Sequence, residues 1–153
     1  MTITFQFDTE CSKHVEPILR SLPEWFGIEK STLQYIKDAD KMPTMLVRDG
    51  DEVIGFLTIH MHFPETAEIH CMGILPKYHR TGTGRLLLQT LEEYLQKKCV
   101  KFLQVKTVSD GSSDKAYAKT RSFYKGVGFI PLEVFPTLWD EKNPCLLMVK
   151  YLE

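Results

Sequence analysis

The residues with the clearest chemistry form a short loop at positions 80–85, which reads Arg-Thr-Gly-Thr-Gly-Arg. The loop lies between an apolar segment typical of a strand and an amphipathic segment typical of a helix. Gly82 and Gly84 allow the backbone to turn tightly and to approach a ligand closely. A helix that begins here directs its free N–H groups and the positive end of its dipole toward the loop. Together with Lys77 and the two loop arginines, this arrangement predicts an anion site, with phosphate groups as the expected ligand.

Two common phosphate-binding motifs do not fit this loop. A Walker-type loop requires GxxxxGK[S/T], and Gly84 is followed by Arg85 instead of Lys. A dinucleotide-binding loop requires GxGxxG, and Leu87 stands where the third glycine would be. A glycine turn that caps a helix and binds nothing is the alternative that the loop alone leaves open.

The segment around the loop, residues 68–87, resembles motif A, the acetyl-CoA-binding motif of the GNAT N-acetyltransferase superfamily. The family pattern is [Q/R]-x-x-G-x-[G/A] after a strand. Both loop glycines match, whereas His79 stands where the family usually has Gln or Arg. In the family the loop binds pyrophosphate mainly through backbone N–H groups. The resemblance therefore implies that coenzyme A contacts His79, Arg80, Thr81, Gly82, Thr83, Gly84 and Arg85.

A second segment, residues 117–129, is similar to the family's motif B, N-x-x-A-x-x-[F/L]-Y-x-x-x-G-F. Tyr124, Gly128 and Phe129 match, and Tyr117 replaces the usual Asn. The two motifs follow each other in the family's order. Together they imply a single GNAT domain over residues 1–153.

The helix that contains motif B has two faces. Helical spacing places Tyr117, Arg121 and Tyr124 on one of them. The resemblance implies that this face meets the cofactor, with Tyr117 and Arg121 as contacts and Tyr124 as the acid that protonates the coenzyme A thiolate. A tyrosine at the edge of the core is the alternative. The other face is expected to be core, and it consists of Ala116, Thr120, Phe123 and Val127.

Two further parts of an acetyl-transfer site lie on the strand before the loop. In the family, pantetheine lies between two splayed parallel strands, so the resemblance implies contacts with backbone groups of Met72, Ile74 and Leu75. Glu68 is the first candidate for the base, because it lies as far before the glycines as the base glutamate of the histone-acetyltransferase branch. Alternation puts His70 on the same face, as an alternative base or proton relay. Deprotonation through water, with Glu68 only positioning the amine, is also open.

Histidines and aromatic residues provide candidates for the acceptor site. His60 and His62 share a face at strand spacing and could, with His70, suggest zinc. No suitably spaced further ligand is evident and acetyl transfer needs no metal, so we expect no metal and assign both histidines to a substrate cleft. Trp25 and Phe26 follow the first predicted helix, and in the family this region lies over the acceptor.

The elements needed to position these residues follow from periodicity. The middle of the chain changes from helical to alternating apolar spacing, and strands then surround two helices. In the second predicted helix, Leu33 and Ile36 are expected to point inward. The pattern indicates a mixed α/β (α+β) domain with a parallel element in its second half. The resemblance implies a mostly antiparallel sheet of about six to seven strands with a splayed parallel pair and about four helices. Helices are predicted at residues 10–22, 31–37 and 115–125, and a further helix is predicted to follow Gly84, with Leu87, Leu88, Leu91, Tyr94 and Leu95 on one apolar face. Strands are predicted at 45–48, 53–60, 68–75, 102–108, 129–135 and 145–152.

Composition argues against nucleic-acid-binding and membrane-spanning proteins. The 153 residues include 19 Lys+Arg and 20 Asp+Glu, a net charge of −1 that argues against a nucleic-acid partner. No apolar run reaches the roughly 18 residues needed to cross a membrane, and the N-terminus lacks a secretion signal. We therefore expect a cytoplasmic protein with no membrane partner. Its four cysteines are expected to be reduced and mostly buried.

The resemblance of the two motifs to the GNAT superfamily favours an enzyme that moves acetyl from acetyl-CoA directly to a primary amine in a ternary complex. A small-molecule acceptor is preferred, because no appended domain to recruit a protein is evident. The alternative is a non-catalytic sensor that binds acyl-CoA, which would have no need of Tyr124 and Glu68. A homodimer is the default among soluble oligomers.

Overall fold

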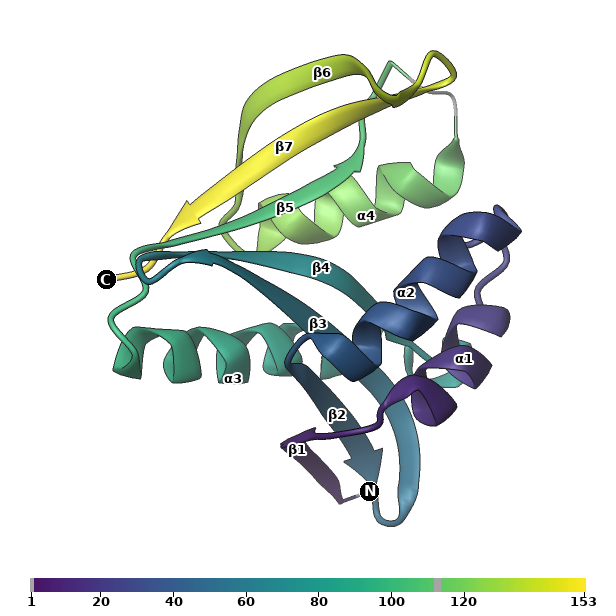
Figure 1. Ribbon diagram of the computed structural model, residues 1–153, viewed down its shortest axis with the longest axis vertical. Helices are drawn as coiled ribbons and strands as arrows, with labels where there is room; N and C mark the ends of the chain where they lie inside the picture. The colour runs from purple at the N-terminus through teal and green to yellow at the C-terminus, as the bar shows by residue number, and fades with distance from the viewer. Residues whose placement is uncertain (1, 112–113) are drawn as a thin grey trace. The chain divides into compact units, whose positions relative to one another are not determined.

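The computed structural model describes residues 2–111 and 114–153. Figure 1 shows their arrangement in helices and strands. In chain order the elements are β1 (Ile3–Asp8), α1 (Ser12–Arg20), α2 (Glu29–Lys41), β2 (Thr44–Asp49), β3 (Glu52–Phe63), β4 (Thr66–Ile74), the 3-10 turn η1 (Pro76–Tyr78), α3 (Thr83–Lys97), β5 (Phe102–Val108), α4 (Lys115–Gly126), β6 (Ile130–Asp140) and β7 (Asn143–Tyr151).

The strands of the described residues form one seven-stranded sheet in the order β1-β2-β3-β4-β5-β7-β6. Strands β4 and β5 are its one parallel pair. A parallel pair needs a long crossover connection, and α3 lies in the chain between these two strands. The mixed, mostly antiparallel sheet and its four helices confirm the predicted fold class.

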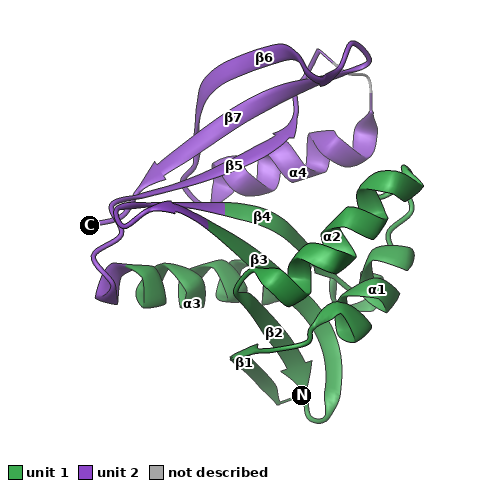
Figure 2. Ribbon diagram, viewed as in Figure 1, with its two compact units in different colours: residues 1–60, 69–95 green, residues 61–68, 96–153 purple. Residues whose placement is uncertain are grey.

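The chain divides into two compact units, which Figure 2 distinguishes by colour. Unit 1 comprises residues 1–60 and 69–95, and unit 2 comprises residues 61–68 and 96–153. Strands β3 and β4 contribute residues to both units. Each unit has buried residues of its own, and the predicted site residues are distributed over both.

In unit 1, helices cover both faces of the strands. Leu46 of β2 belongs to the apolar cluster around α1, and alternation directs its neighbour Met45 to the opposite face. Phe7 lies opposite Met45 in the β1–β2 pairing and contacts Tyr94 of α3, with ring centroids 4.6 Å apart. Helices α1 and α3 therefore pack on opposite faces. The cluster around α1 contains Cys11, Val15, Ile18, Leu19, Leu22, Ala39, Leu46, Phe56 and Cys71.

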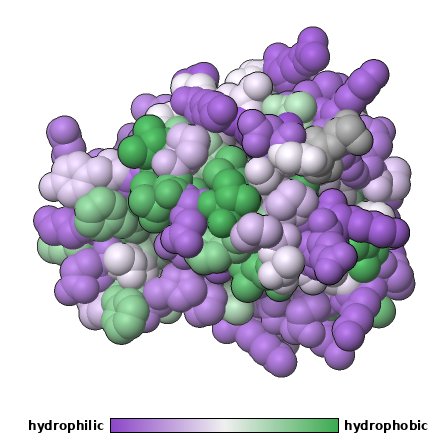
Figure 3. Space-filling model, turned by 90° about the horizontal axis from the view of Figure 1, so that it is seen from above, coloured by the Kyte–Doolittle hydropathy of each residue, from purple (hydrophilic) through white to green (hydrophobic). Residues whose placement is uncertain are grey.

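In unit 2, α4 packs against β5, and β5, β7 and β6 pair in antiparallel fashion. Leu103 and Val105 of β5 are buried, whereas Gln104 and Lys106 on its other face are half-buried. Strand β6 lies at the edge of the sheet. Figure 3 shows apolar residues among polar ones on one face of the molecule. The exposed apolar side chains of β6 are Ile130, Leu132, Val134, Leu138 and Trp139.

Two expectations for the N-terminal part are corrected. Strand β1 was not among the predicted elements, although residues 3–8 alternate between half-buried and exposed positions. Helix α2 is longer than predicted, and Leu33, expected to point inward, is 45% exposed. Instead α2 buries Asp38, because this carboxylate bonds a histidine of β4.

Candidate active site

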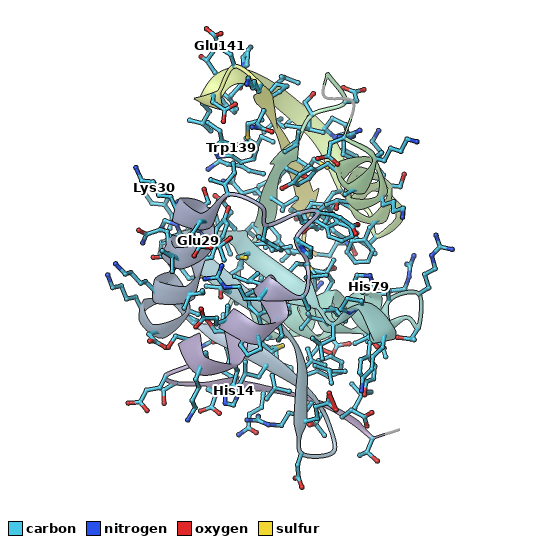
Figure 4. The ribbon with its side chains drawn as sticks, turned by 90° about the vertical axis from the view of Figure 1, so that its right-hand side faces the viewer. His14, Glu29, Lys30, His79, Trp139 and Glu141 are labelled. Atoms are coloured by element: carbon cyan, nitrogen blue, oxygen red, sulfur yellow. The ribbon has the colours of Figure 1, made fainter. Side chains whose placement is uncertain are left out.

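The loop at residues 80–85 follows a tightly fixed turn. The N–H of Leu75 donates to the carbonyl of Ile54 at 2.8 Å, and the His79 ring donates from Nε2 to the carbonyl of Ile74 at 2.7 Å. Thr81 donates its hydroxyl to the Tyr78 carbonyl at 2.6 Å. Figure 4 shows His79 beside the loop that leads into α3. The turn thus presents the loop in a defined conformation at the start of this helix.

The loop backbone has the open, left-handed conformations that a close approach to a ligand needs. Arg80 has φ +61° and Gly82 has φ +83°. A Cβ added at Gly82 would meet no atom within 4 Å, so this stretch of backbone is accessible. Helix α3 begins at Thr83, and the first N–H groups of a helix have no intrahelical partner. Arg80 and Arg85 are exposed beside them. The residues present therefore fit an anionic phosphate group.

The strand that precedes the loop supplies fewer free groups than the resemblance implies. Met72 is half-buried and Ile74 is buried. The N–H of Leu75 already bonds the carbonyl of Ile54, so it is not available to a ligand. Gly73 is tightly surrounded, since an added Cβ would lie 3.2 Å from atoms of Ile18, Leu22 and Phe56.

Helix α4 in unit 2 turns the predicted cofactor face inward. Tyr124 is 5% exposed, and its ring contacts Phe123 and Phe129 with centroids 5.4 Å apart in both cases. Arg121 is 9% exposed and donates from its guanidinium to the carbonyl of Val108 at 2.7 Å. Tyr117 is half-buried.

The expected core face of α4 is therefore only partly correct. Val127 is buried, but Ala116, Thr120 and Phe123 are half-buried. The helix buries Arg121 and Tyr124 instead, because Arg121 ties α4 to the end of β5 and Tyr124 packs on aromatic rings.

Glu68 lies in unit 2 and is itself buried, at the centre of a part-buried polar cluster. Its Oε1 atom accepts from Nε2 of His62 at 2.7 Å, from Nε2 of Gln104 at 2.8 Å and from Nζ of Lys106 at 3.3 Å. Burial alone raises the pKa of Glu68, but the hydrogen bonds from Gln104 and His62 and the charge of Lys106 outweigh it and lower the pKa below its usual value. Glu68 is thus held as a carboxylate anion.

His70 lies in unit 1 and has a carboxylate partner of its own. Its Nε2 atom is 2.8 Å from Oδ2 of Asp38, and the other oxygen of Asp38 accepts from Nε2 of Gln34 at 2.9 Å. The rings of Tyr35 and His60 meet the His70 ring edge-on, with centroid distances of 5.4 and 6.3 Å.

The predicted acceptor-site aromatics also lie in unit 1. The Trp25 ring meets His79 edge-on at 6.1 Å, and Phe26 meets Tyr35 at 5.9 Å. Both are half-buried against the apolar cluster around α1. Unit 1 therefore brings Trp25 to His79, which directly precedes the loop. It also brings Phe26 to Tyr35, whose ring contacts His70.

Three polar residues that bond Glu68 or His70 were not among the predicted site residues. Gln104 and Lys106 alternate along β5 and could have been placed on one face from the sequence. Asp38 carried no such signal, since its partner is 32 positions away.

Three other findings bear on expectations from composition. Cys11, Cys71 and Cys145 are buried and Cys99 is exposed, as the prediction of mostly buried thiols requires. Among the residues described, no group of three or more His, Cys, Asp or Glu side chains could hold a metal ion. None of the helices in the described part of the chain has the length and apolar character needed to cross a bilayer.

The comparison with known families decides the class of protein. The model of the acetyltransferase (GNAT) family matches residues 12–129, well over half of the chain. The chain belongs to the GNAT acetyltransferase family. The resemblance seen in the two sequence motifs is thereby confirmed. No curated protein is similar enough in sequence to match this GNAT chain.

Solved structures of GNAT proteins share this fold. A protein described as a GNAT acetyltransferase from Desulfovibrio desulfuricans is 15% identical, has a TM-score of 0.86 and covers 99% of this chain and 100% of its own. The ribosomal-protein-S18-alanine N-acetyltransferase from Escherichia coli is 16% identical, with a TM-score of 0.77 and coverage of 99% and 95%. An aminoglycoside 6'-N-acetyltransferase complexed with coenzyme A is 17% identical, with a TM-score of 0.76 and coverage of 100% and 98%. At these identities the likeness concerns the fold.

Proposed function

We propose that this protein transfers an acetyl group from acetyl-CoA to a primary amine of a small molecule. The observation that carries the proposal is the open loop of residues 80–85, with Gly82 at φ +83°, at the start of α3 in a chain of the GNAT family. The coenzyme A in the structure of the aminoglycoside enzyme supports the same co-substrate.

Acetyl-CoA supplies the reactive thioester, and the loop would hold its phosphates. The donors are the N–H groups of the loop and of the first turn of α3, with the guanidinium groups of Arg80 and Arg85 beside them. Helix dipole and arginine charge act in the same direction, since both attract anions. His79, Thr81 and Thr83 shape this loop through their hydrogen bonds.

We propose that Tyr124 is the acid that donates a proton to the departing coenzyme A thiolate. A neutral amine attacks the carbonyl carbon, so that a C–N bond forms and an oxyanion develops. When this intermediate collapses, the C–S bond breaks, and the thiolate takes the hydroxyl proton of Tyr124. The acetylated nitrogen then gives up its extra proton, which restores the tyrosine. The assignment is supported by the motif B match at Tyr124 in a chain of the GNAT family, and by a hydroxyl that is protonated at neutral pH.

The amine must first lose a proton, because most primary amines are protonated at neutral pH. The strand β4 offers two candidates for this base, Glu68 and His70, and each is held by partners within its own unit. Water-mediated deprotonation is the third route.

The identity of the acceptor is proposed only by class. The names of the neighbours show that proteins of this fold differ in their acceptors: one acts on an alanine of a ribosomal protein, another on an aminoglycoside. A small amine is preferred here, with Trp25, Phe26, His60 and His62 as candidate contacts.

The test combines turnover with binding. Acetyl-CoA is incubated with a panel of amines, including polyamines, aminoglycosides, amino acids and a lysine peptide, and coenzyme A is quantified by chromatography. Chromatography is preferred to thiol reagents, because Cys99 is exposed and would react with them. Acetyl-CoA binding is measured by calorimetry. Turnover supports the enzyme; binding without turnover supports an acyl-CoA sensor; absence of both contradicts each.

A further inference from the structure

A histidine of β4 is paired with a buried carboxylate that belongs to a different element. The Nε2 atom of His70 lies 2.8 Å from Oδ2 of Asp38 in α2. The side chain of Asp38 is 11% exposed, and that of His70 is 22% exposed. Burying a carboxylate is costly unless it is hydrogen-bonded, and both oxygens of Asp38 are bonded, the second by Gln34. Hydrogen bonds therefore fix the position of Asp38 beside His70, and the pair is not an exposed ion pair at the surface.

This contact fixes the protonation pattern of the ring. A carboxylate can only accept hydrogen bonds, so Nε2 of His70 is the donor. In a neutral imidazole the other nitrogen, Nδ1, then carries the lone pair. No described residue donates a hydrogen bond to Nδ1. Nδ1 is therefore the ring position at which a proton could be accepted, and the bond to Asp38 fixes the ring in this tautomer.

The other candidate base is differently placed. Three donors, from His62, Gln104 and Lys106, converge on one oxygen of Glu68. Protonation of either oxygen would remove the negative charge that these donors stabilise, so the arrangement favours the anion. Such an anion attracts a cationic amine but has little tendency to accept its proton.

Within unit 1, the described contacts of the His70 ring involve few other ionisable groups. Helix α2 presents Asp38 and Tyr35 to it, and β3 presents His60. On its own strand the next residue of the same face is Glu68, whose charge is engaged by its own donors. Asp38 is thus the one carboxylate bonded to the His70 ring among the described residues.

We propose that His70 is the base that accepts the proton of the acceptor amine and that Asp38 is the positioning residue that holds it. The inference rests on the proposed acetyl transfer. An ammonium group gives one proton to Nδ1 of His70, and the freed lone pair attacks the thioester carbonyl. His70 then releases this proton to solvent after the amide and coenzyme A have formed. Each turnover therefore releases one proton besides these two products.

The kinetic test uses four variants of the full chain. His70→Gln is expected to lower kcat by about 100-fold and to abolish the acidic limb of the kcat/KM profile. Asp38→Asn keeps the shape of the side chain and is expected to lower kcat by about 10- to 100-fold, with KM for acetyl-CoA unchanged. Glu68→Gln should keep the acidic limb. Asp40→Asn is the matched control: Asp40 is exposed on the same helix, and an amide oxygen can still accept from the N–H of Ser12.

A spectroscopic readout separates this inference from the proposed function. In ¹⁵N NMR of the imidazole rings, wild-type His70 should be the tautomer with the proton on Nε2, and Asp38→Asn should redistribute the two tautomers. Circular dichroism checks that each variant is folded.

The outcomes are distinct. Two results would overturn the pairing of His70 with Asp38 as base and positioning residue while leaving acetyl transfer intact. One is that the wild type transfers acetyl and folded Asp38→Asn has the same kcat. The other is that wild-type His70 carries its proton on Nδ1. Failure of the wild type to acetylate any amine would overturn the proposed function, and the role of base with it.

Discussion

The hydroxyl group of Tyr78 donates a hydrogen bond of 2.7 Å to Oδ2 of Asp49, which ties the turn before the loop to the end of β2. The other oxygen of Asp49 accepts from the N–H of Thr2 at 3.0 Å. The contact lowers the pKa of Asp49 and raises the pKa of Tyr78 to about 12. Tyr78 therefore stays a hydrogen-bond donor throughout the physiological pH range, and its bond to Asp49 anchors the turn before the loop to β2.

Removing this donor should affect cofactor binding rather than chemistry. In Tyr78→Phe the turn loses its bond to β2 and the loop of residues 80–85 becomes less ordered. We expect KM for acetyl-CoA to rise several-fold with little change in kcat, as measured by initial rates. Tyr151→Phe, on an exposed side chain of β7, is the control and should leave both constants unchanged. A loss confined to kcat would contradict this role of Tyr78.

Gly82 allows a test of backbone geometry that is free of clashes with neighbouring residues. Gly82 has φ +83° and Gly50 has φ +61°, and an added Cβ meets nothing within 4 Å at either position. Changing either to alanine should therefore cost a similar free energy of unfolding, about 1 kcal/mol, because an L residue disfavours positive φ.

Only one of the two substitutions should change ligand affinity. Gly82→Ala moves the loop backbone that we propose to meet the phosphates, whereas Gly50→Ala affects the turn between β2 and β3. Calorimetric titration with coenzyme A should thus show weaker binding for Gly82→Ala alone. Equal affinities in the two variants would remove the loop from the binding site.

Much of the fold could be predicted because its signals are local. Strand β5 was predicted with the bounds that it has, since residues 102–108 form one run rich in apolar and β-branched residues between polar positions. The loop could be found because glycines and a helix start stand next to each other. Helix α4 was placed well for the same reason, with Gly126 at its end.

The parts that could not be predicted depend on contacts distant in sequence. The positions of Leu33 and Ile36 in the predicted helix indicated that both point inward. Leu33 is exposed instead, and the helix buries Asp38, which bonds His70. In α4 the buried Arg121 is explained by the carbonyl of Val108, which no helical pattern reveals. Strand β1 is a different case: Ile3, Phe5 and Phe7 alternate, and this signal was available in the sequence.

Tyr124 should contribute to turnover and not to cofactor affinity. Tyr124→Phe keeps the ring contacts with Phe123 and Phe129 and removes only the hydroxyl. We expect kcat to fall by about 100-fold, the usual contribution of general acid catalysis. Calorimetric affinity for acetyl-CoA should change little. If kcat in the variant equals that of the wild type, the leaving thiolate takes its proton from another source.

The polar cluster of Glu68 predicts a pH-dependent stability. Because the folded-state pKa of Glu68 lies below its usual value of 4.5, its ionised form stabilises the fold above that pH. This contribution disappears as the pH falls through the folded-state pKa, where protonation removes the negative charge that the three donors stabilise.

Glu68→Gln should therefore be less stable than the wild type by about 1–3 kcal/mol at neutral pH. Urea unfolding at pH 7, 5 and 3 measures the difference between the two proteins, and we expect it to shrink toward pH 3. Glu133→Gln, on an exposed carboxylate of β6, is the matched control and should change stability little at any pH. A difference between wild type and Glu68→Gln that is the same at pH 3 and pH 7 would show that the charge of Glu68 does not stabilise the cluster. His62, Gln104 and Lys106 would then be held by packing alone.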